Sequence, residues 1–181
     1  MGKLITLGIV GVVALVLVSM FIGTYNYGNS TEVALKATKK NNENILAQYS
    51  QKVREAAQVP DMYVEGLTKI TREAMTGRYG AEGSKAVFQW IKEQNPNVDP
   101  QVYIKLQQIV ESGRDQFQVG QTRLIDQRRG YEESLGSFPR GIVLSILGYP
   151  RINLDDFNIV TNEYASDAFE KGKEEGPLKL R

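Results

Sequence analysis

The 181-residue sequence contains no cysteine and no histidine. Without cysteine the chain can form no disulfide, thiol nucleophile or thiolate metal site. Without histidine it lacks the usual general base near neutral pH and the commonest metal ligand, so a Ser-His-Asp triad is impossible within the chain. The enzymatic options that remain are carboxylate-only and Ser-Lys chemistry. We therefore predict a protein that is not an enzyme, with no catalytic, cofactor-binding or metal-binding residues and no cofactor.

The chain also lacks an excess of either charge, since 22 basic and 21 acidic side chains give a formal net charge of +1. Broad nucleic-acid binding normally leaves a strongly basic footprint. The charge balance therefore argues against a nucleic-acid partner.

One long apolar run stands at the start of the chain, and nothing after it is comparably apolar. From Leu4 to Ile22 there is no charged residue, and at about 1.5 Å per helical residue the run spans about 28 Å, close to the hydrocarbon thickness of a bilayer. Tyr25 and Tyr27 follow, where an interfacial aromatic belt would lie. The pattern predicts a transmembrane anchor over residues 1–24 and a single-pass membrane protein.

Three other interpretations of the run fit less well. A cleaved signal peptide has a shorter apolar core and a small-x-small cleavage site, which is not found after Ser19. A buried helix would need a larger domain to surround it. Gly2 and Thr6 fit the spacing of a myristoylation site, but a spanning helix directly behind them makes that match a coincidence.

The orientation of the anchor is weakly encoded. Lys36, Lys39 and Lys40 lie within about 20 residues of the apolar run and favour a cytoplasmic C-terminal part by the positive-inside tendency. Lys3, on the other side of the run, acts in the opposite direction.

Beyond the anchor the periodicity is helical. Gly28-Asn29-Ser30 is expected to break the first helix, and Ser30 or Thr31 to cap a second one that ends near Gln58. Residues 39–44 of this second helix are polar all round, which predicts an exposed or loosely packed stretch.

Two shorter helices are expected next. The first starts near Met62 and stops at Gly77, where a flexible glycine-rich loop runs to Gly83. The second is expected to be capped by Ser84. It presents apolar side chains at Val87, Phe88, Trp90 and Ile91.

The strongest local signal is one amphipathic helix from about Pro100 to Ser137. Asp99 is a typical N-cap, and proline is favoured at the first helical position. Gly113 and Gly120 fall on the apolar stripe, where they would let a neighbouring helix approach closely. The stripe comprises Tyr103, Leu106, Ile109 or Val110, Gly113, Phe117, Gly120, Leu124, Arg128, Tyr131 and Leu135.

The end of the chain adds one short element. Phe138-Pro139 ends the long helix, and Gly141 to Leu147 can form a short apolar helix. We predict an all-α fold, an N-terminal transmembrane helix followed by a long antiparallel helical bundle over residues 25–160. Residues 161–181 are predicted to be a polar, disordered tail.

Several polar or aromatic groups have a functional and a structural interpretation. Arg123, Arg128 and Arg129 can bind phosphate or an anionic lipid head, but ion pairs with Asp126 and Glu132 are favoured. Asp155-Asp156 lacks the other ligands of a calcium loop. Glu132 and Glu133 point about 100° apart on a helix, so they form no acid-base pair.

For Trp90 and Phe88, core packing is favoured over a partner-binding or membrane-touching patch.

In the order and spacing of its motifs, from the anchor to about Phe157, the chain resembles the LemA family of bacterial membrane proteins. Its residues depart from the family pattern at Lys52 and Arg54, at Glu132, and around Gly120-Gln121, so it would be a divergent member. The matching segments are Tyr25-Asn26, Glu32, Val59-Pro60-Asp61-Met62-Tyr63-Val64, Leu106-Gln107, Gln127-Arg128-Arg129-Gly130-Tyr131, Phe138-Pro139, Leu147-Gly148-Tyr149 and Phe157.

The resemblance implies a long helical bundle behind one anchor and no established catalytic mechanism. One branch of the family, in magnetosome-forming bacteria, is associated with building internal membranes, and other members are often encoded beside membrane proteases. The expected function is that of a membrane-anchored scaffold or interaction protein. Its expected partners are the lipid bilayer and either further copies of itself or another membrane protein. The alternative is an adaptor or regulator of an envelope protease or stress system.

Overall fold

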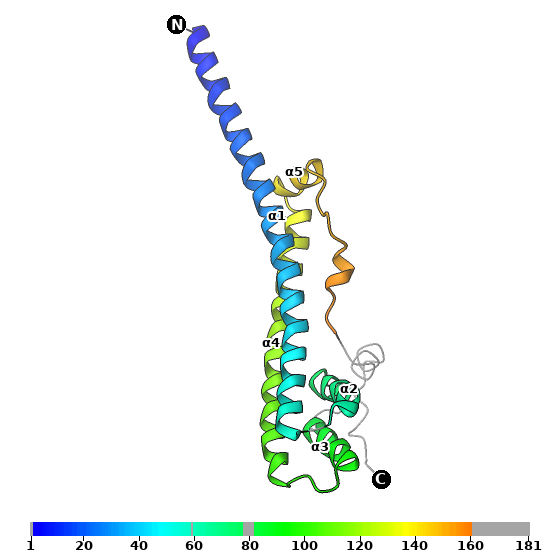
Figure 1. Ribbon diagram of the computed structural model, residues 1–181. Coiled ribbons are helices and arrows are strands. Elements are labelled where there is room, and N and C mark those ends of the chain that lie inside the picture. Colours follow the sequence, from blue (N-terminus) through cyan, green and yellow to red (C-terminus); the bar gives the residue numbers. More distant parts are fainter. Residues whose placement is uncertain (1, 59, 78–81, 161–181) are drawn as a thin grey trace, which may run out of the picture. The chain divides into compact units, whose positions relative to one another are not determined.

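The computed structural model describes residues 2–58, 60–77 and 82–160, and the regular structure of these residues is helical with no strand (Figure 1). The predicted all-α fold class is therefore confirmed. The predicted tail, 161–181, lies outside the described residues.

The elements are α1 (Gly2–Ala57), the short 3-10 helix η1 (Asp61–Tyr63), α2 (Val64–Met75), α3 (Gly83–Gln94), α4 (Gln101–Gly136), α5 (Arg140–Ile146) and a second 3-10 helix, η3 (Leu154–Phe157).

The first helix is continuous where the sequence predicts a break. α1 runs from Gly2 to Ala57 through Gly28-Asn29-Ser30, so the expected break and the cap at Ser30 or Thr31 are both wrong. Gly28 is needed for close packing, because a Cβ there would lie 2.9 Å from the ring of Tyr149 and 3.0 Å from Leu144. The hydroxyl of Ser30 donates to the carbonyl oxygen of Tyr27 at 3.0 Å, so it bonds back within the same helix and caps no new one.

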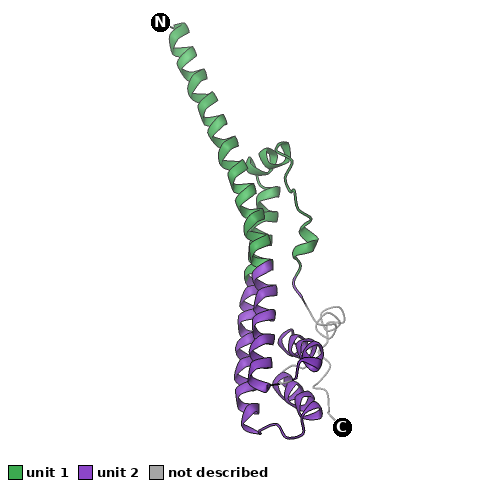
Figure 2. Ribbon diagram, viewed as in Figure 1, with its two compact units in different colours: residues 1–39, 123–158 green, residues 40–122, 159–181 purple. Residues whose placement is uncertain are grey.

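The described residues divide into two compact units, unit 1 with residues 2–39 and 123–158 and unit 2 with the described residues of 40–122 and 159–160 (Figure 2). In unit 1, residues 24–39 of α1 pack antiparallel to the C-terminal part of α4. The hydroxyl of Tyr27 bonds to that of Ser134 at 2.6 Å, and the hydroxyl of Thr38 donates to Oε1 of Gln127 at 2.7 Å. The core of this unit is a cluster of six buried side chains, Leu35, Leu124, Tyr131, Leu144, Tyr149 and Phe157.

In unit 2, residues 40–57 of α1 and 101–122 of α4 are again antiparallel. A Cβ on Gly113 would meet the Tyr49 ring at 2.9 Å, and one on Gly120 would collide with the amide of Asn42, so both glycines permit the close approach that the sequence predicts. The expectation that residues 39–44 are exposed or loosely packed is wrong at Asn42, which is buried because it faces Gly120.

The two short helices of unit 2, α2 and α3, contact each other and share an apolar cluster that includes Leu67, Val87 and Ile91. Phe88 and Trp90 pack against this cluster, so the predicted core role is confirmed for both. α2 starts at Val64 and ends at Met75, within two residues of the predicted limits near Met62 and Gly77. α3 starts at Gly83 and has no side-chain cap, so the capping role predicted for Ser84 is wrong.

The long helix α4 agrees with its prediction. Oδ1 of Asp99 accepts a hydrogen bond of 2.8 Å from the backbone N–H of Gln101, which is the predicted N-cap interaction. Every stripe position predicted from the sequence is buried or half-buried, and Ile104 and Val119, which lie off the stripe, are exposed. The short apolar helix predicted over Gly141–Leu147 is α5.

Candidate functional site

A buried carboxylate joins three segments of unit 1. Glu32 on α1 is 6% exposed, and its Oε1 accepts hydrogen bonds from the Tyr131 hydroxyl on α4 at 2.9 Å and from the Arg151 backbone N–H at 2.7 Å. An acidic side chain is buried at this depth only when its oxygens are hydrogen-bonded. Glu32 therefore ties α1, α4 and the chain after α5 together.

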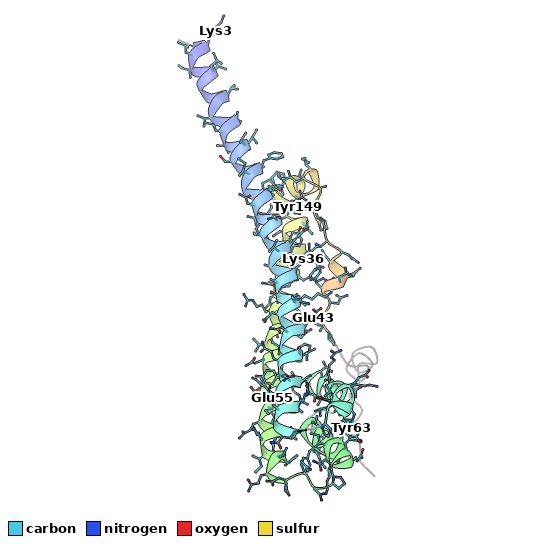
Figure 3. The ribbon with its side chains drawn as sticks, in the orientation of Figure 1. Lys3, Lys36, Glu43, Glu55, Tyr63 and Tyr149 are labelled. Carbon is cyan, nitrogen blue, oxygen red and sulfur yellow. The ribbon has the colours of Figure 1, made fainter. Side chains whose placement is uncertain are left out.

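The turn after α5 brings the Arg151 backbone N–H to this carboxylate and the Tyr149 side chain to α1. Gly148 has a φ of +76°, the Tyr149 N–H bonds to the carbonyl oxygen of Leu144 at 2.9 Å, and the Gly148 N–H bonds to that of Ser145 at 3.0 Å. These two bonds with a left-handed glycine form a Schellman motif, which ends a helix and reverses the chain. The reversal places Tyr149 beside α1 (Figure 3), where its hydroxyl donates to the carbonyl oxygen of Tyr25 at 3.3 Å.

Aromatic rings and a guanidinium group surround the outer side of this network. The Arg151 guanidinium carbon lies 4.3 Å from the centroid of Tyr149 and 5.4 Å from that of Tyr25. The two rings contact each other edge to face with centroids 6.2 Å apart. Arg140 lies over the ring of Tyr27 at 4.4 Å. Two cations are thus held against the tyrosines that follow the apolar run.

The protonation of the network follows from its burial. Burial first, and then the hydrogen bond to Glu32, raise the pKa of Tyr131 above its ordinary value, and burial raises the pKa of Tyr149. Hydrogen bonding to Tyr25 raises the pKa of Arg151, so its guanidinium is charged. At neutral pH both tyrosines are therefore neutral donors. The arrangement is suited to holding segments together, since the Glu32 carboxylate accepts bonds from two of them.

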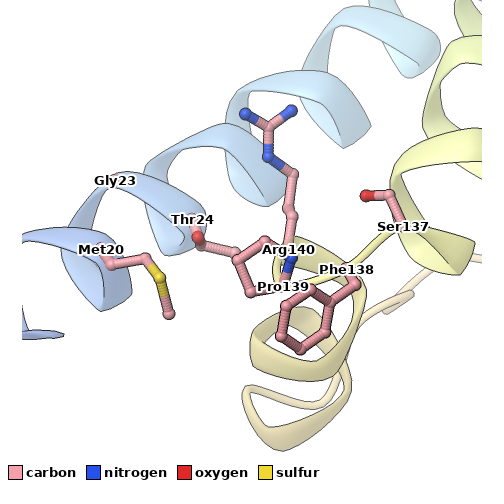
Figure 4. Close-up of a pocket in the computed structure, with 7 residues that line it drawn as sticks. All are labelled: Met20, Gly23, Thr24, Ser137, Phe138, Pro139 and Arg140. Atoms are coloured by element: carbon pink, nitrogen blue, oxygen red, sulfur yellow. The ribbon is translucent and has the colours of Figure 1, made fainter.

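An open pocket of about 460 Å³ lies where the apolar run of α1 ends (Figure 4). Met20, Gly23 and Thr24 of α1 form one wall of the pocket. The other wall consists of Phe138, Pro139 and Arg140, and Ser137, which follows α4, also lines the pocket. Three apolar side chains, one in the pocket wall and two in α5, are largely exposed. Phe138 is 84% exposed, Ile142 55% and Ile146 66%.

The charged groups singled out in the sequence lie on surfaces. Arg128 pairs with Glu132 at 2.9 Å and Arg129 with Asp126 at 3.4 Å, so the predicted ion pairs are confirmed for these two arginines. Arg123 is exposed and is not brought into the network.

The paired acidic residues do not converge on a common site. Arg128 also reaches Asp155 at 3.7 Å and the side chain of Asn158, which attaches the segment after α5 to α4. The backbone oxygen of Asp156 accepts from Lys39 at 2.8 Å. Glu133 is exposed. Over 2–58, 60–77 and 82–160, no group of three or more acidic side chains is gathered so that it could hold a metal ion.

No protein-family model, curated protein or solved structure matches the chain. Within unit 1, several residues that carry the LemA resemblance lie together. Glu32 and Tyr131 are joined by a hydrogen bond, and Tyr149 and Phe157 belong with Tyr131 to one buried apolar cluster.

The sequence analysis missed Arg151, Gly28 and the buried state of Glu32. A signal was present: Thr24, Gly28, Glu32 and Leu35 recur at steps of three or four, which is the spacing of one helix face. The expected break at residues 28–30 concealed this pattern, because the four residues were divided between two elements.

Proposed function

We propose that the protein is a non-enzymatic, membrane-anchored helical scaffold that holds a partner, or further copies of itself, at the surface of a bilayer. The observation that carries this proposal is the change in surroundings along α1. Among the described residues, α1 is the one helix long and apolar enough to cross a membrane, and the apolar stretch is not covered by protein. An apolar surface on all sides of a helix requires an apolar solvent.

The same helix then becomes part of the bundle. From Thr24 onward, α1 contributes buried side chains, including Glu32 and Leu35. The anchor and the bundle therefore share one helix rather than a flexible connection. Such a continuous helix would transmit the position of the bilayer directly to whatever the bundle binds.

The chemistry of the buried network also supports a scaffold. The Glu32 carboxylate accepts two hydrogen bonds and joins three segments, which is a structural use of a carboxylate. The resemblance to the LemA family agrees with this role, and we include divergent LemA membership in the proposal. The residues that carry the resemblance in unit 1 are those that hold α1, α4 and the chain after α5 together.

Crosslinking in native membranes tests the proposal. The full-length chain is tagged after Arg181, crosslinked in intact membranes and purified, and the captured proteins are identified by mass spectrometry. The matched control carries Val12→Arg and Val16→Arg in the apolar run, since each arginine near a bilayer centre costs about 2.5–3.5 kcal/mol on insertion scales.

We expect the tagged chain in the membrane fraction, crosslinked to itself or to one integral membrane protein, and we expect the control to lose both. A protease as the enriched partner would favour the alternative function, an adaptor or regulator of an envelope protease. Recovery of the chain in the soluble fraction, or of the same background proteins with chain and control, would contradict the proposal.

A further inference from the structure

A short apolar surface borders the end of the candidate membrane span. Phe138 lies in the turn before α5, and Ile142 and Ile146 are four residues apart within the helix. More than half of each of these side chains is exposed. Residues four apart lie on one face of a helix. The opposite face of α5 is packed into unit 1 through Gly141, Val143 and Leu144. α5 is thus amphipathic, with its apolar exposed face uncovered within unit 1.

The position of this surface along α1 identifies what covers it. Phe138 and Pro139 lie beside Met20, Gly23 and Thr24, at the last turn of the apolar run (Figure 4). A bilayer that contains the run up to Ile22 therefore has its hydrocarbon boundary at the level of Phe138. The apolar face of α5 is continuous with the lipid-facing surface of α1.

The positive charges of Arg140 and Arg151 lie further from the bilayer centre than this apolar surface, in the interfacial layer. The interfacial layer on each side of the hydrocarbon core is about 5–7 Å thick, and Tyr25 and Tyr27 lie about 4–8 Å beyond Ile22 along the helix. The guanidinium groups of Arg151 and Arg140 lie over the rings of these two tyrosines. Within the described part of the chain neither arginine forms an ion pair with a carboxylate. Lipid phosphates occupy this layer and complement both charges.

We propose that α5 and the preceding Phe138 form a second membrane contact, in which Phe138, Ile142 and Ile146 enter the hydrocarbon boundary and Arg140 and Arg151 bind lipid phosphates. This inference rests on the proposed membrane anchoring. Its consequence is that the bundle is held to the bilayer at two points, the span and α5, so that rotation of unit 1 about the axis of α1 is restricted.

Spin labels test this contact cleanly, because the full-length chain has no cysteine of its own. Single variants Ile142→Cys and Ile146→Cys are labelled and reconstituted into vesicles of phosphatidylcholine and phosphatidylglycerol. The accessibility of each label to oxygen, which concentrates in lipid, is compared with its accessibility to a water-soluble nickel complex. Val33→Cys on α1 is the matched control, since Val33 is 57% exposed and lies about 16 Å beyond Ile22 along the helix.

We expect a several-fold higher oxygen-to-nickel ratio at residues 142 and 146 than at residue 33. Val12→Cys, in the middle of the run, separates the two proposals. A lipid-like ratio at residue 12 with water-like ratios at 142 and 146 would overturn the second contact and leave the anchor intact. A water-like ratio at residue 12 would overturn the anchoring itself.

The role of Arg140 has its own test. With the label at residue 146, Arg140→Gln is expected to lower the oxygen-to-nickel ratio in the same vesicles, whereas Arg140→Lys, which keeps the charge, is expected to preserve most of it. A ratio that Arg140→Gln leaves unchanged would overturn the assignment of Arg140 to lipid phosphates.

Discussion

The hydroxyl of Tyr131 donates a hydrogen bond of 2.9 Å to Oε1 of Glu32, 99 positions away in the sequence. Tyr131 is fully buried and Glu32 is 6% exposed. This bond connects α4 to α1 one to two turns beyond the aromatic residues that follow the apolar run.

Replacing Glu32 should destabilise the fold more than replacing its partner. Glu32→Ala leaves the buried Tyr131 hydroxyl and the part-buried Arg151 N–H without an acceptor, which we expect to cost about 2–4 kcal/mol in the free energy of unfolding. Tyr131→Phe removes one bond and should cost about 1–3 kcal/mol. Chemical unfolding of the full-length chain in detergent, followed by circular dichroism, measures both. The exposed Glu133→Gln is the control, and a Glu32→Ala variant as stable as this control would contradict the structural role.

Alkaline pH should weaken the fold through the buried tyrosines. The pKa of Tyr131 in the folded chain is raised above the ordinary value of 10.0 by burial and by the bond to Glu32. Above pH 10 the unfolded chain therefore loses this proton before the folded chain does, so stability is fully present below pH 10 and falls as pH rises further. Melting temperatures from pH 8 to 11.5 should fall less steeply for Tyr131→Phe. Parallel curves for the two proteins would contradict this linkage.

Gly28 distinguishes a continuous helix from a broken one. If α1 were interrupted there, Gly28→Ala would be harmless or would favour helix. In the observed packing, the new methyl group meets the Tyr149 ring and Leu144, so we expect a loss of about 1–3 kcal/mol from overpacking. Gly130→Ala is the control, because a Cβ there meets no atom within 4 Å and should stabilise α4 by about 0.5–1 kcal/mol. Urea midpoints of the three chains give the comparison.

A coupled pair in unit 2 tests the second close approach. The side-chain amide of Asn42 is buried and has no hydrogen-bond partner within the described residues, and it faces Gly120. Gly120→Ala should destabilise the chain by about 1–3 kcal/mol, whereas Asn42→Ala should be near neutral. In the double variant the collision is relieved, so the effects should not add. Strict additivity in a double-mutant cycle would mean that the two residues do not contact each other.

The sequence predicted the elements that are decided locally. The α4 stripe and the Asp99 cap depend on neighbours within a few residues, and both are observed. The break at Gly28 was wrong because the reason for glycine there is Tyr149, more than a hundred positions away. The same holds for Asn42, whose polar neighbours indicate exposure although the facing Gly120 encloses it. The spacing of Glu32 on its helix face indicates burial, but no local pattern identifies Tyr131, 99 positions away, as its hydrogen-bond partner.

The central claim is that the candidate membrane span and the bundle share one uninterrupted helix. Spin labels at Val18→Cys and Lys36→Cys test it in reconstituted full-length chain, since both side chains are exposed and lie five helical turns apart on one face. Pulsed electron resonance should give a narrow distance distribution centred near 27 Å, from 18 residues at about 1.5 Å each. A broad distribution, or one centred well below this distance, would mean that the helix breaks between the anchor and the bundle and would contradict the account.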